Sequence, residues 1–464
     1  MTGARLLYNV MKIRKIKYNN HRVLGNLVLD FVNPATGLAF DTIVLIGENG
    51  TGKTTILTSL SDYFNCITLQ PFEYIEYDAD GNQYRIEPVP DGQVCFHNRI
   101  NISTGTSESI NRNTSYDPKR MYADKKDLRS YASIFSKARA DFKVDKIGSI
   151  STRTLDSEMR EQDNNDNYTS LKQLIVDIDN QDSKDFKNQN RVGQVAWNTF
   201  YPTSRMHRFT NAFDSFFCGK VKFDRIETAN QDNIIFFKKN NQDVSIDSLS
   251  TGEKQIVYRG AYLLKNNGKM DEGVVFIDEP ELSMHPDWQR KILDYFQRLY
   301  KTPAGQLKAQ MFIASHSEYL VETALKQSNT LVVVLKENGG TVTAKPITMP
   351  LLLPSIIPSE VNYAAFGIPS VDYHIALYGA IQSKYGVHYI TDCDSKIESC
   401  VPYYNPAVHE KITANPNKPA SPYKTVCTKV RNHIDHPDTA PSYTEEEMVE
   451  SIKLMRDILL NVAP

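Results

Sequence analysis

One short segment, Gly47-x4-Gly52-Lys53-Thr54, constrains the fold of this chain more than any other feature. It follows an apolar run at 42–46 that is typical of a buried strand, and it precedes a helical pattern at 56–64. Glycines in such a P-loop let backbone N–H groups wrap around phosphate oxygens. We expect Lys53 to bring positive charge to the phosphates and the Thr54 hydroxyl to ligate Mg²⁺. The predicted nucleotide-binding residues are Gly47, Asn49, Gly50, Gly52, Lys53, Thr54 and Thr55.

A pair of acids closes a second apolar run. Asp278 and Glu279 directly follow residues 274–277, and an acid at the C-terminal end of such a strand faces the ligand crevice of an α/β sheet. We expect Asp278 to hold Mg²⁺ together with Thr54, and Glu279 to act as general base toward an attacking water. Alone, the pattern is equally typical of a strand-end turn. With the P-loop upstream, it favours a catalytic site.

The order of strand and helix patterns predicts an interrupted α/β domain. Strand–helix alternation stops near residue 64 and resumes near 236, with a strand expected at 234–239. We therefore expect the two lobes of a P-loop ATPase head at 1–63 and 236–350, separated by a mixed, partly helical insertion or lid at 64–235. Within that insertion, helices are expected at 125–143 and 170–180.

The last part of the chain has a different pattern. Prolines 350, 354 and 358 mark a break, and the text beyond it predicts an all-α C-terminal domain at 355–464. Its last helix is expected at 444–461. Ser442 is the predicted N-cap of that helix, and Glu445 would complete a capping box.

Three further segments carry a family resemblance. They are LSTGEKQ at 249–255, DEPELSMHP at 278–286 and FIASHS at 312–317. Together with the P-loop, and in this order, they resemble the motifs of ABC-type ATPase heads of the SMC and RecF class. Thr251 stands where that family more often has a small residue. The resemblance covers roughly 1–63 and 236–335.

This resemblance implies a mechanism and a partner. Two heads would sandwich two ATP molecules, so the chain would form a homodimer or higher homo-oligomer. Ser250, Gly252 and Glu253 of one copy would form the signature that reaches the γ-phosphate bound by the other copy's P-loop. His316 would be the switch histidine that contacts the γ-phosphate. A serine hydroxyl and backbone amides at a helix N-terminus are chemically suited to binding an anion.

A narrower resemblance concerns the biological setting. The compact head, the insertion without a sustained coiled coil and the text NYAAFGIPSVDYHIALYG (362–379) look like ATPases of bacterial anti-phage systems, namely the PtuA type of Septu and of some retron systems. That resemblance implies a separately encoded nuclease of HNH type as partner. It also implies that the ATPase regulates this nuclease.

The C-terminal segment contains a pair that supports a different hypothesis. Arg431 and His436 resemble the R-x4–6-H motif of HEPN ribonucleases, which would make the chain a self-contained, tRNA-cleaving toxin. A structural explanation is also available, because Arg431 and Asp435 have the i,i+4 spacing of a helical ion pair. A third hypothesis is a DNA-repair ATPase of RecF type, in which the basic stretch 12–22 could contact nucleic acid.

Composition limits these hypotheses. The 464 residues carry 53 basic and 55 acidic side chains, a formal net charge of −2. This excludes a protein that coats DNA through bulk positive charge, so nucleic acid would be met by a local patch or a recruited partner. The sequence has no apolar run of the roughly 18 residues that a membrane span needs. Six scattered cysteines suggest reduced thiols, and we expect a cytoplasmic protein.

Overall fold

The structure is a computed structural model, and it divides into two compact units, Met1–Pro346 and Ile347–Pro464. The residues that the structure describes are 10–65, 68–89, 96–110, 125–138, 168–229, 232–264, 270–302, 304–347, 351–415 and 419–463.

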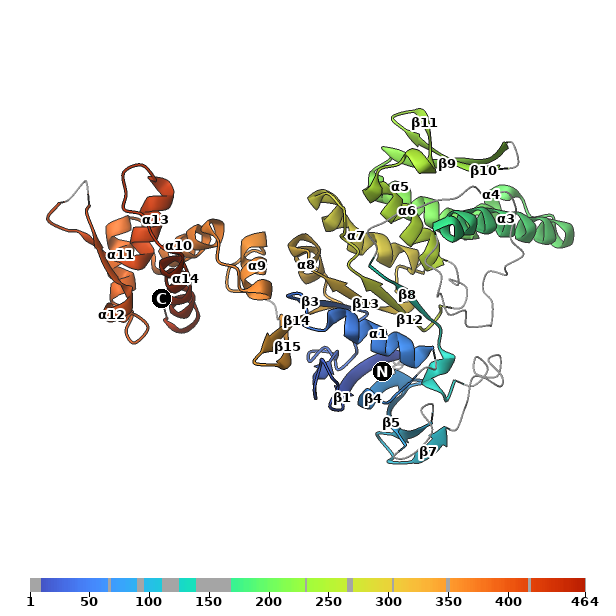
Figure 1. The fold of residues 1–464 in the computed structure, drawn as a ribbon, viewed down its shortest axis with the longest axis horizontal. Helices are drawn as coiled ribbons and strands as arrows, with labels where there is room; N and C mark the ends of the chain where they lie inside the picture. Colours follow the sequence, from blue (N-terminus) through green and yellow to red (C-terminus); the bar gives the residue numbers. More distant parts are fainter. Residues whose placement is uncertain are drawn as a thin grey trace. The chain divides into compact units, whose positions relative to one another are not determined.

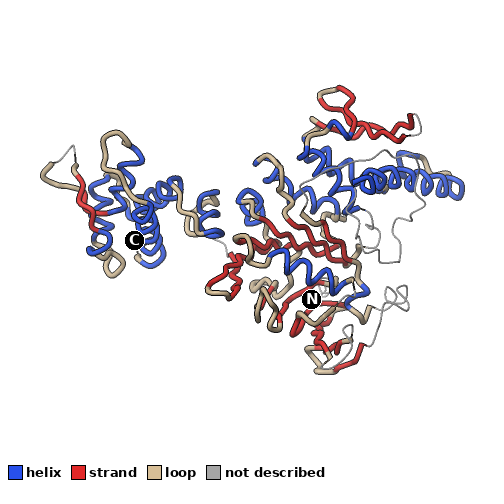
Figure 2. The backbone as a smooth tube through the Cα atoms, viewed as in Figure 1, coloured by secondary structure: helices blue, strands red, loops and turns tan. Residues whose placement is uncertain are grey.

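A six-stranded sheet forms the centre of the first unit (Figures 1 and 2). Its strand order is β15-β14-β3-β13-β12-β8, and the five strands from β14 to β8 run parallel. The strands are β3 (Thr42–Gly47), β8 (Ser133–Ser136), β12 (Gly273–Asp278), β13 (Ala309–Ser315), β14 (Thr330–Asn338) and β15 (Thr341–Ile347). Every residue of β3, β12 and β13 is buried, as expected for parallel strands covered on both faces. Because β3, β13 and β12 are parallel neighbours, their C-terminal ends meet at one edge.

A second, antiparallel sheet lies against one face of the first. Its strand order is β2-β1-β4-β5-β6-β7, and helix α1 (Lys53–Phe64) packs between the two sheets. The strands are β1 (Lys12–Tyr18), β2 (Val28–Asp30), β4 (Phe72–Ala79), β5 (Asn82–Pro88), β6 (His97–Asn101) and β7 (Ser107–Ile110). This unit therefore has the α/β class that the motifs predicted.

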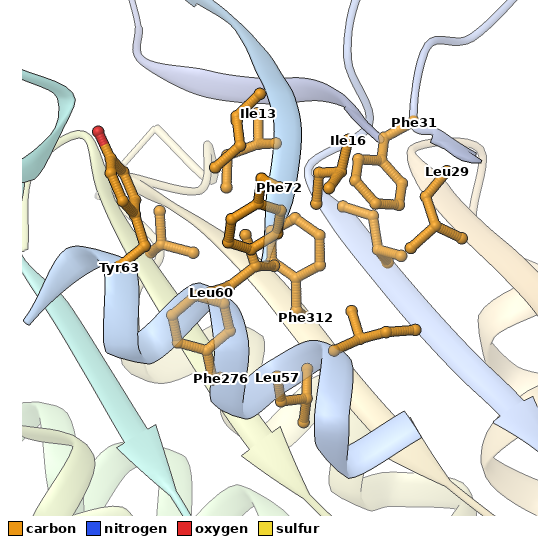
Figure 3. Close-up of a cluster of buried hydrophobic side chains, with 14 of the residues drawn as sticks. Ile13, Ile16, Leu29, Phe31, Leu57, Leu60, Tyr63, Phe72, Phe276 and Phe312 are labelled. Carbon is orange, nitrogen blue, oxygen red and sulfur yellow. The ribbon is translucent and has the colours of Figure 1, made fainter. Parts of the chain in front are cut away.

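The core between these layers follows from strand alternation. Phe276 and Phe312 extend from neighbouring strands of the central sheet toward Leu57 and Leu60 of α1 and Phe72 of β4 (Figure 3). All five side chains are fully buried. At about 25 cal/mol per Å² of apolar surface removed from water, this cluster strongly favours one placement of α1. It thereby fixes the helix whose first residue is Lys53.

Helices cover the other face of the central sheet (Figure 1). These are α6 (Thr251–Leu264), α7 (Pro286–Leu299) and α8 (Glu318–Leu325). α7 and α8 pack against each other, and α8 also contacts β14. Each helix follows a loop that carries one of the predicted motifs.

The stretch 64–235, predicted as an insertion, supplies elements to several layers. Strands β4 to β7 belong to the antiparallel sheet and β8 to the edge of the central sheet. The stretch also contains α3 (Tyr168–Gly193), α4 (Trp197–Phe200), α5 (Arg205–Phe217) and β9 (Val221–Ala229). β9 forms a three-stranded sheet with β10 (Asp232–Lys239), which begins in the stretch, and β11 (Gln242–Ser245), which follows it. α3 packs on α6, and α5 packs on α6 and α7.

Two predictions within this stretch have different outcomes. The helix expected at 170–180 is confirmed as part of α3. The helix expected at 125–143 is wrong for the residues that the structure describes. A short 3₁₀ turn at 128–130 is followed by β8, which pairs with β12 from Val274 to Ile277. Pairing with the sheet has overridden a weak helical spacing, while residues 139–143 lie outside the described part.

The second unit is mainly helical, as predicted. Its helices are α9 (Pro358–Phe366), α10 (Val371–Tyr385), α11 (Ile390–Glu398), α12 (Pro406–His409), α13 (Val426–Asp435) and α14 (Glu445–Asn461). It is not entirely helical, because β16 (Glu410–Thr413) and β17 (Tyr423–Thr425) form a small antiparallel sheet. The predicted cap of the last helix is also wrong. Thr444, not Ser442, is the N-cap of α14, and Glu447, not Glu445, completes the capping box.

Candidate nucleotide site

The P-loop connects β3 to α1, and its glycines are required by the local geometry. A Cβ on Gly47 would lie 2.3 Å from the carbonyl oxygen of Leu335 on the neighbouring strand. Gly52 is the left-handed N-cap of α1 with φ of 91°, and a Cβ there would lie 2.4 Å from the Leu24 side chain. A larger residue at position 47 would displace the loop from β14, and one at position 52 would be strained by the left-handed φ. Asn49 and Gly50, between them, are exposed and Thr55 is half-buried.

Lys53 is the first residue of α1, and its side chain is only 5% exposed. Its ammonium group donates hydrogen bonds to the carbonyl oxygens of Gly47 at 2.9 Å and Glu48 at 2.8 Å. Burial lowers the pKa of Lys53, while the carboxylates of Glu279, Asp278 and Glu281 oppose that shift. The loop therefore holds a positive charge inside its own curve, where phosphate oxygens would be bound.

Thr54 and Asp278 meet as predicted. The Thr54 hydroxyl donates to the Asp278 carboxylate, with distances of 3.0 and 3.2 Å to the two oxygens. Asp278 is the last residue of β12 and is 4% exposed. Burial raises its pKa, and the Thr54 hydrogen bond opposes this shift. A hydroxyl and a carboxylate beside a phosphate-binding loop are the hard oxygen ligands that suit Mg²⁺, so these two residues fit the predicted metal site.

Glu279 and His316 also lie together. The Nε2 atom of His316 is 3.5 Å from a carboxylate oxygen of Glu279. Glu279 has a left-handed φ of 43°, and its N–H donates to the Ala314 carbonyl at 2.9 Å. The pKa of His316 is lowered by burial first and then by the charge of Lys53, and Glu279 opposes both. A neutral imidazole at this position can donate one hydrogen bond and accept another.

The structure adds residues that the sequence reasoning missed. Arg259, in the middle of α6, donates to the carbonyl oxygens of Asp278 at 2.9 Å and Glu279 at 3.3 Å. Glu281 accepts a hydrogen bond from the backbone N–H of His316 at 2.6 Å. Both contacts join segments that are distant in sequence, so no local spacing could have indicated them. An arginine among the mostly apolar residues of this helix is the one feature of the sequence that could have indicated Arg259.

The predicted signature lies at the start of α6. The Ser250 N–H and hydroxyl both donate to Glu253, each at 2.8 Å, and Lys239 forms an ion pair with the other oxygen of Glu253 at 2.8 Å. Glu253 therefore fixes Ser250 at the end of the helix. A Cβ on Gly252 would lie 2.9 Å from both the Ser283 carbonyl and the Trp288 ring, so this glycine permits close packing on the loop after β12.

Arg431 and His436 lie in the second unit, at the end of α13. Arg431 forms the predicted i,i+4 ion pair with Asp435 at 2.6 Å and also donates to the Asn432 side chain at 3.1 Å. His436 is the C-cap of the helix, and its N–H donates to the Asn432 carbonyl. This geometry supplies a structural role for Arg431.

Within the described residues, no group of three or more His, Cys, Asp or Glu side chains could hold a metal ion. None of the helices described is both long and apolar enough to cross a membrane.

Comparisons with known proteins bear on the predicted resemblance. Residues 99–322 match the family model described as "AAA domain, putative AbiEii toxin, Type IV TA system". The chain is 22% identical over 407 residues to the "Retron Ec83 probable ATPase" of Escherichia coli, which covers 71% of this chain and 72% of that protein. It is 23% identical over 331 residues to the "Septu protein PtuA" of Bacillus thuringiensis, which covers 68% and 74%.

Solved structures of SMC heads are also similar. One is an SMC head bound to the C-terminal winged-helix domain of ScpA, with a TM-score of 0.39 and 12% identity over 73% of this chain and 98% of that one. The SMC head domain of Thermotoga maritima matches with a TM-score of 0.36 and 14% identity, over 73% and 100%. The predicted resemblance to AAA-type ATPases, and more narrowly to retron and Septu PtuA ATPases, is therefore confirmed.

Proposed function

We propose that this chain binds ATP with Mg²⁺ and hydrolyses it to ADP and phosphate. One observation carries the proposal: five side chains that a phosphate-hydrolysing site needs stand at the adjoining ends of β3, β12 and β13. They are Lys53, Thr54, Asp278, Glu279 and His316. Parallel strands bring their C-terminal ends to one edge, and ligands bind there in open α/β sheets.

Each side chain has a definable task in this chemistry. Lys53 and the loop amides bind the phosphates, and Thr54 and Asp278 would hold Mg²⁺, which neutralises charge on the phosphate oxygens. Glu279 accepts a proton from the attacking water. It is suited to this because its side chain is 28% exposed, whereas that of Asp278 is almost fully buried. His316, 3.5 Å from Glu279, contacts the γ-phosphate side of the site.

The head is proposed to act as a dimer. Ser250 directly precedes α6, where the first backbone amides of the helix offer an anion-binding surface, and its hydroxyl is held beside them by Glu253. In a nucleotide sandwich this surface would meet the γ-phosphate held by a second copy. Binding of ATP would then favour the closed dimer, and hydrolysis would release it.

Mixing two inactive variants tests this arrangement. Lys53→Ala removes the P-loop charge but leaves the signature, and Ser250→Arg blocks the signature but leaves the P-loop. A mixed dimer contains one complete site, so the mixture should hydrolyse ATP when neither variant does alone. Hydrolysis by Ser250→Arg alone, or none in the mixture although mixed dimers are detected by cross-linking, would contradict the proposed dimer.

We further propose that the ATPase regulates a separate nuclease in anti-phage defence, in the cytoplasm. The support is the similarity to a retron ATPase and to a Septu protein. In cells that carry the gene with its native neighbouring genes, phage should form fewer plaques. The Lys53→Ala substitution should restore the number of plaques. An HNH nuclease encoded beside the gene and co-purifying with the chain would identify the partner. Unchanged protection by Lys53→Ala would refute the regulatory role of ATP.

A further inference from the structure

Glu281 is a buried acid two residues after the proposed general base. It lies in the loop between β12 and α7 and is only 9% exposed. One carboxylate oxygen accepts the backbone N–H of His316 at 2.6 Å, and the other, Oε2, is buried with no hydrogen-bond partner among the residues described. Burial raises the pKa of Glu281, and the hydrogen bond from the His316 backbone opposes this shift. A carboxyl group placed at such cost calls for a specific role.

The hydrogen bond between His316 and Glu281 continues the ladder of hydrogen bonds between β12 and β13. β12 and β13 pair in parallel up to Asp278 and Ala314, and the Glu279 N–H still donates to the Ala314 carbonyl. At Glu279 the chain turns away from the ladder with a φ of 43°. The His316 N–H is bound instead by the side chain of Glu281. Two hydrogen bonds thus join the segments that carry Glu279 and His316. One runs from the Glu279 N–H to the Ala314 carbonyl, and the other from the His316 N–H to the Glu281 carboxylate.

The neighbours of His316 are fixed in the same way. The Ser317 N–H donates to the Ser315 hydroxyl at 3.0 Å, and the Ser317 hydroxyl donates to Gln289 of α7 at 2.6 Å. Ser317 is also the N-cap of α8. Hydrogen bonds therefore hold the backbone before and after His316. The bond to Glu281 then fixes the orientation of the peptide group of His316 itself. The imidazole, 3.5 Å from Glu279, takes its direction from that peptide.

We propose that Glu281 is a positioning residue for ATP hydrolysis: its carboxylate holds the main chain of His316 so that the imidazole faces Glu279. This inference rests on the proposed function of the site. A competing role, in which Glu281 is itself the general base, is disfavoured because Glu281 is less exposed to water than Glu279. The Glu279 side chain is 28% exposed and beside His316, whereas Glu281 is 9% exposed and bonded to a backbone amide.

Two substitutions separate positioning from proton transfer. Glu281→Gln keeps an oxygen that can accept the His316 N–H but removes the charge and the basic group. Glu281→Leu keeps a similar volume and removes the acceptor. We expect the Gln variant to retain a kcat within about 3-fold of wild type, and the Leu variant to lose roughly 10- to 100-fold, with KM for ATP changed less than about 3-fold. Equal loss in both variants would overturn the positioning role in favour of a charge or base role.

A double variant gives a readout that a general loss of stability would not produce. If Glu281 acts through His316, then Glu281→Leu should cost nothing further in a His316→Ala background. Additive losses would contradict the proposal. Glu322→Leu is the matched control. Glu322 is equally buried, on α8, but its carboxylate pairs with Lys326 and Arg290 and does not contact the His316 loop. This variant should keep the wild-type kcat.

Folding and function can be told apart in the same experiment. Affinity for ATP and the melting temperature are measured for each variant, and Glu281→Ala replaces the Leu variant if the latter does not fold. If the wild-type protein hydrolyses ATP and the Leu or Ala variant of Glu281 has the same kcat, the positioning role alone is overturned. A wild-type protein that binds ATP but never hydrolyses it overturns the proposed function, and this inference with it.

Discussion

The hydroxyl of Thr54 donates to both carboxylate oxygens of Asp278, at 3.0 and 3.2 Å, across 224 residues of sequence. Thr54 belongs to the first helix of the head and Asp278 to the end of β12, beyond the long middle stretch. The contact therefore requires that the segments on either side of that stretch fold together. It also places two oxygen ligands where Mg²⁺ would be held beside the P-loop.

Removing the Thr54 hydroxyl should weaken Mg²⁺ binding more than it weakens the fold. Thr54→Val has nearly the same shape but no oxygen, whereas Thr54→Ser keeps the hydroxyl. We expect the Val variant to need roughly 10-fold more Mg²⁺ for half-maximal turnover, because one of its few protein ligands is lost. The Ser variant should behave like wild type. A Mg²⁺ titration of the ATPase rate is the measurement, and identical curves for Val and wild type would refute the metal role.

Lys53→Ala should abolish ATP binding. The ammonium group is almost fully buried within the loop, and a buried point charge beside phosphates is worth several kcal/mol, so the Kd should rise at least about 100-fold. Titration with ATP by calorimetry measures this change. Lys326→Ala, at a more exposed lysine that is the C-cap of α8, is the control and should bind normally. ATP binding by Lys53→Ala with wild-type affinity would mean that the loop does not hold phosphate.

His97 should make the first unit less stable in acid. It is buried, neither ring nitrogen has a hydrogen-bond partner among the residues described, and burial lowers its pKa to about 4. The unfolded chain takes up the proton below about pH 6.5, but the native protein does so only near pH 4. Protonation of His97 thus leaves the free energy of unfolding unchanged above about pH 6.5. It lowers that free energy by roughly 3 kcal/mol as the pH falls to about 4.

Urea unfolding at about pH 7.5 and about pH 5 tests this expectation. His97→Phe fills the space with a ring that cannot be protonated, so its midpoint should fall less between the two pH values than that of wild type. His207→Gln, at a half-buried histidine on α5, should keep the wild-type difference. A His97→Phe protein with the same pH dependence as wild type would assign the acid sensitivity to other groups.

Arg431→Ala should have little effect. Its ion pair with Asp435 lies at the surface of α13, and exposed helical pairs of this spacing contribute about 0.3–0.5 kcal/mol. The melting temperature should change by only a few degrees at most, and purified protein should not cleave tRNA with or without Arg431. Cleavage by wild type that disappears in both Arg431→Ala and His436→Ala would instead support the ribonuclease hypothesis.

The positions of the glycine loop, of the acid pair after β12 and of His316 could be predicted because each follows a buried parallel strand. Continuous apolar runs ending in a glycine loop, an acid or a histidine are local patterns, and the sheet brings their ends together by topology alone. Thr54 and Asp278 were therefore paired correctly across the middle stretch.

Other features depended on long-range pairing. β8 replaced an expected helix because its partner, β12, begins at Gly273, far along the chain. Glu281 and Arg259 act on backbone atoms of distant loops, and no spacing in the sequence reports such contacts. The N-cap at Thr444 was missed for a local reason: Ser442 and Thr444 each have an acid three residues later, and only the second pair satisfies both N–H groups.

The rate of phosphate release by Glu279→Gln, compared with wild type under saturating ATP and Mg²⁺, tests the central claim most directly. If Glu279 is the general base, turnover should fall roughly 100-fold or more while ATP affinity is retained, because the amide cannot accept the proton from water. Wild-type turnover by Glu279→Gln would contradict the account, since the adjoining ends of β3, β12 and β13 would then not form a hydrolytic site.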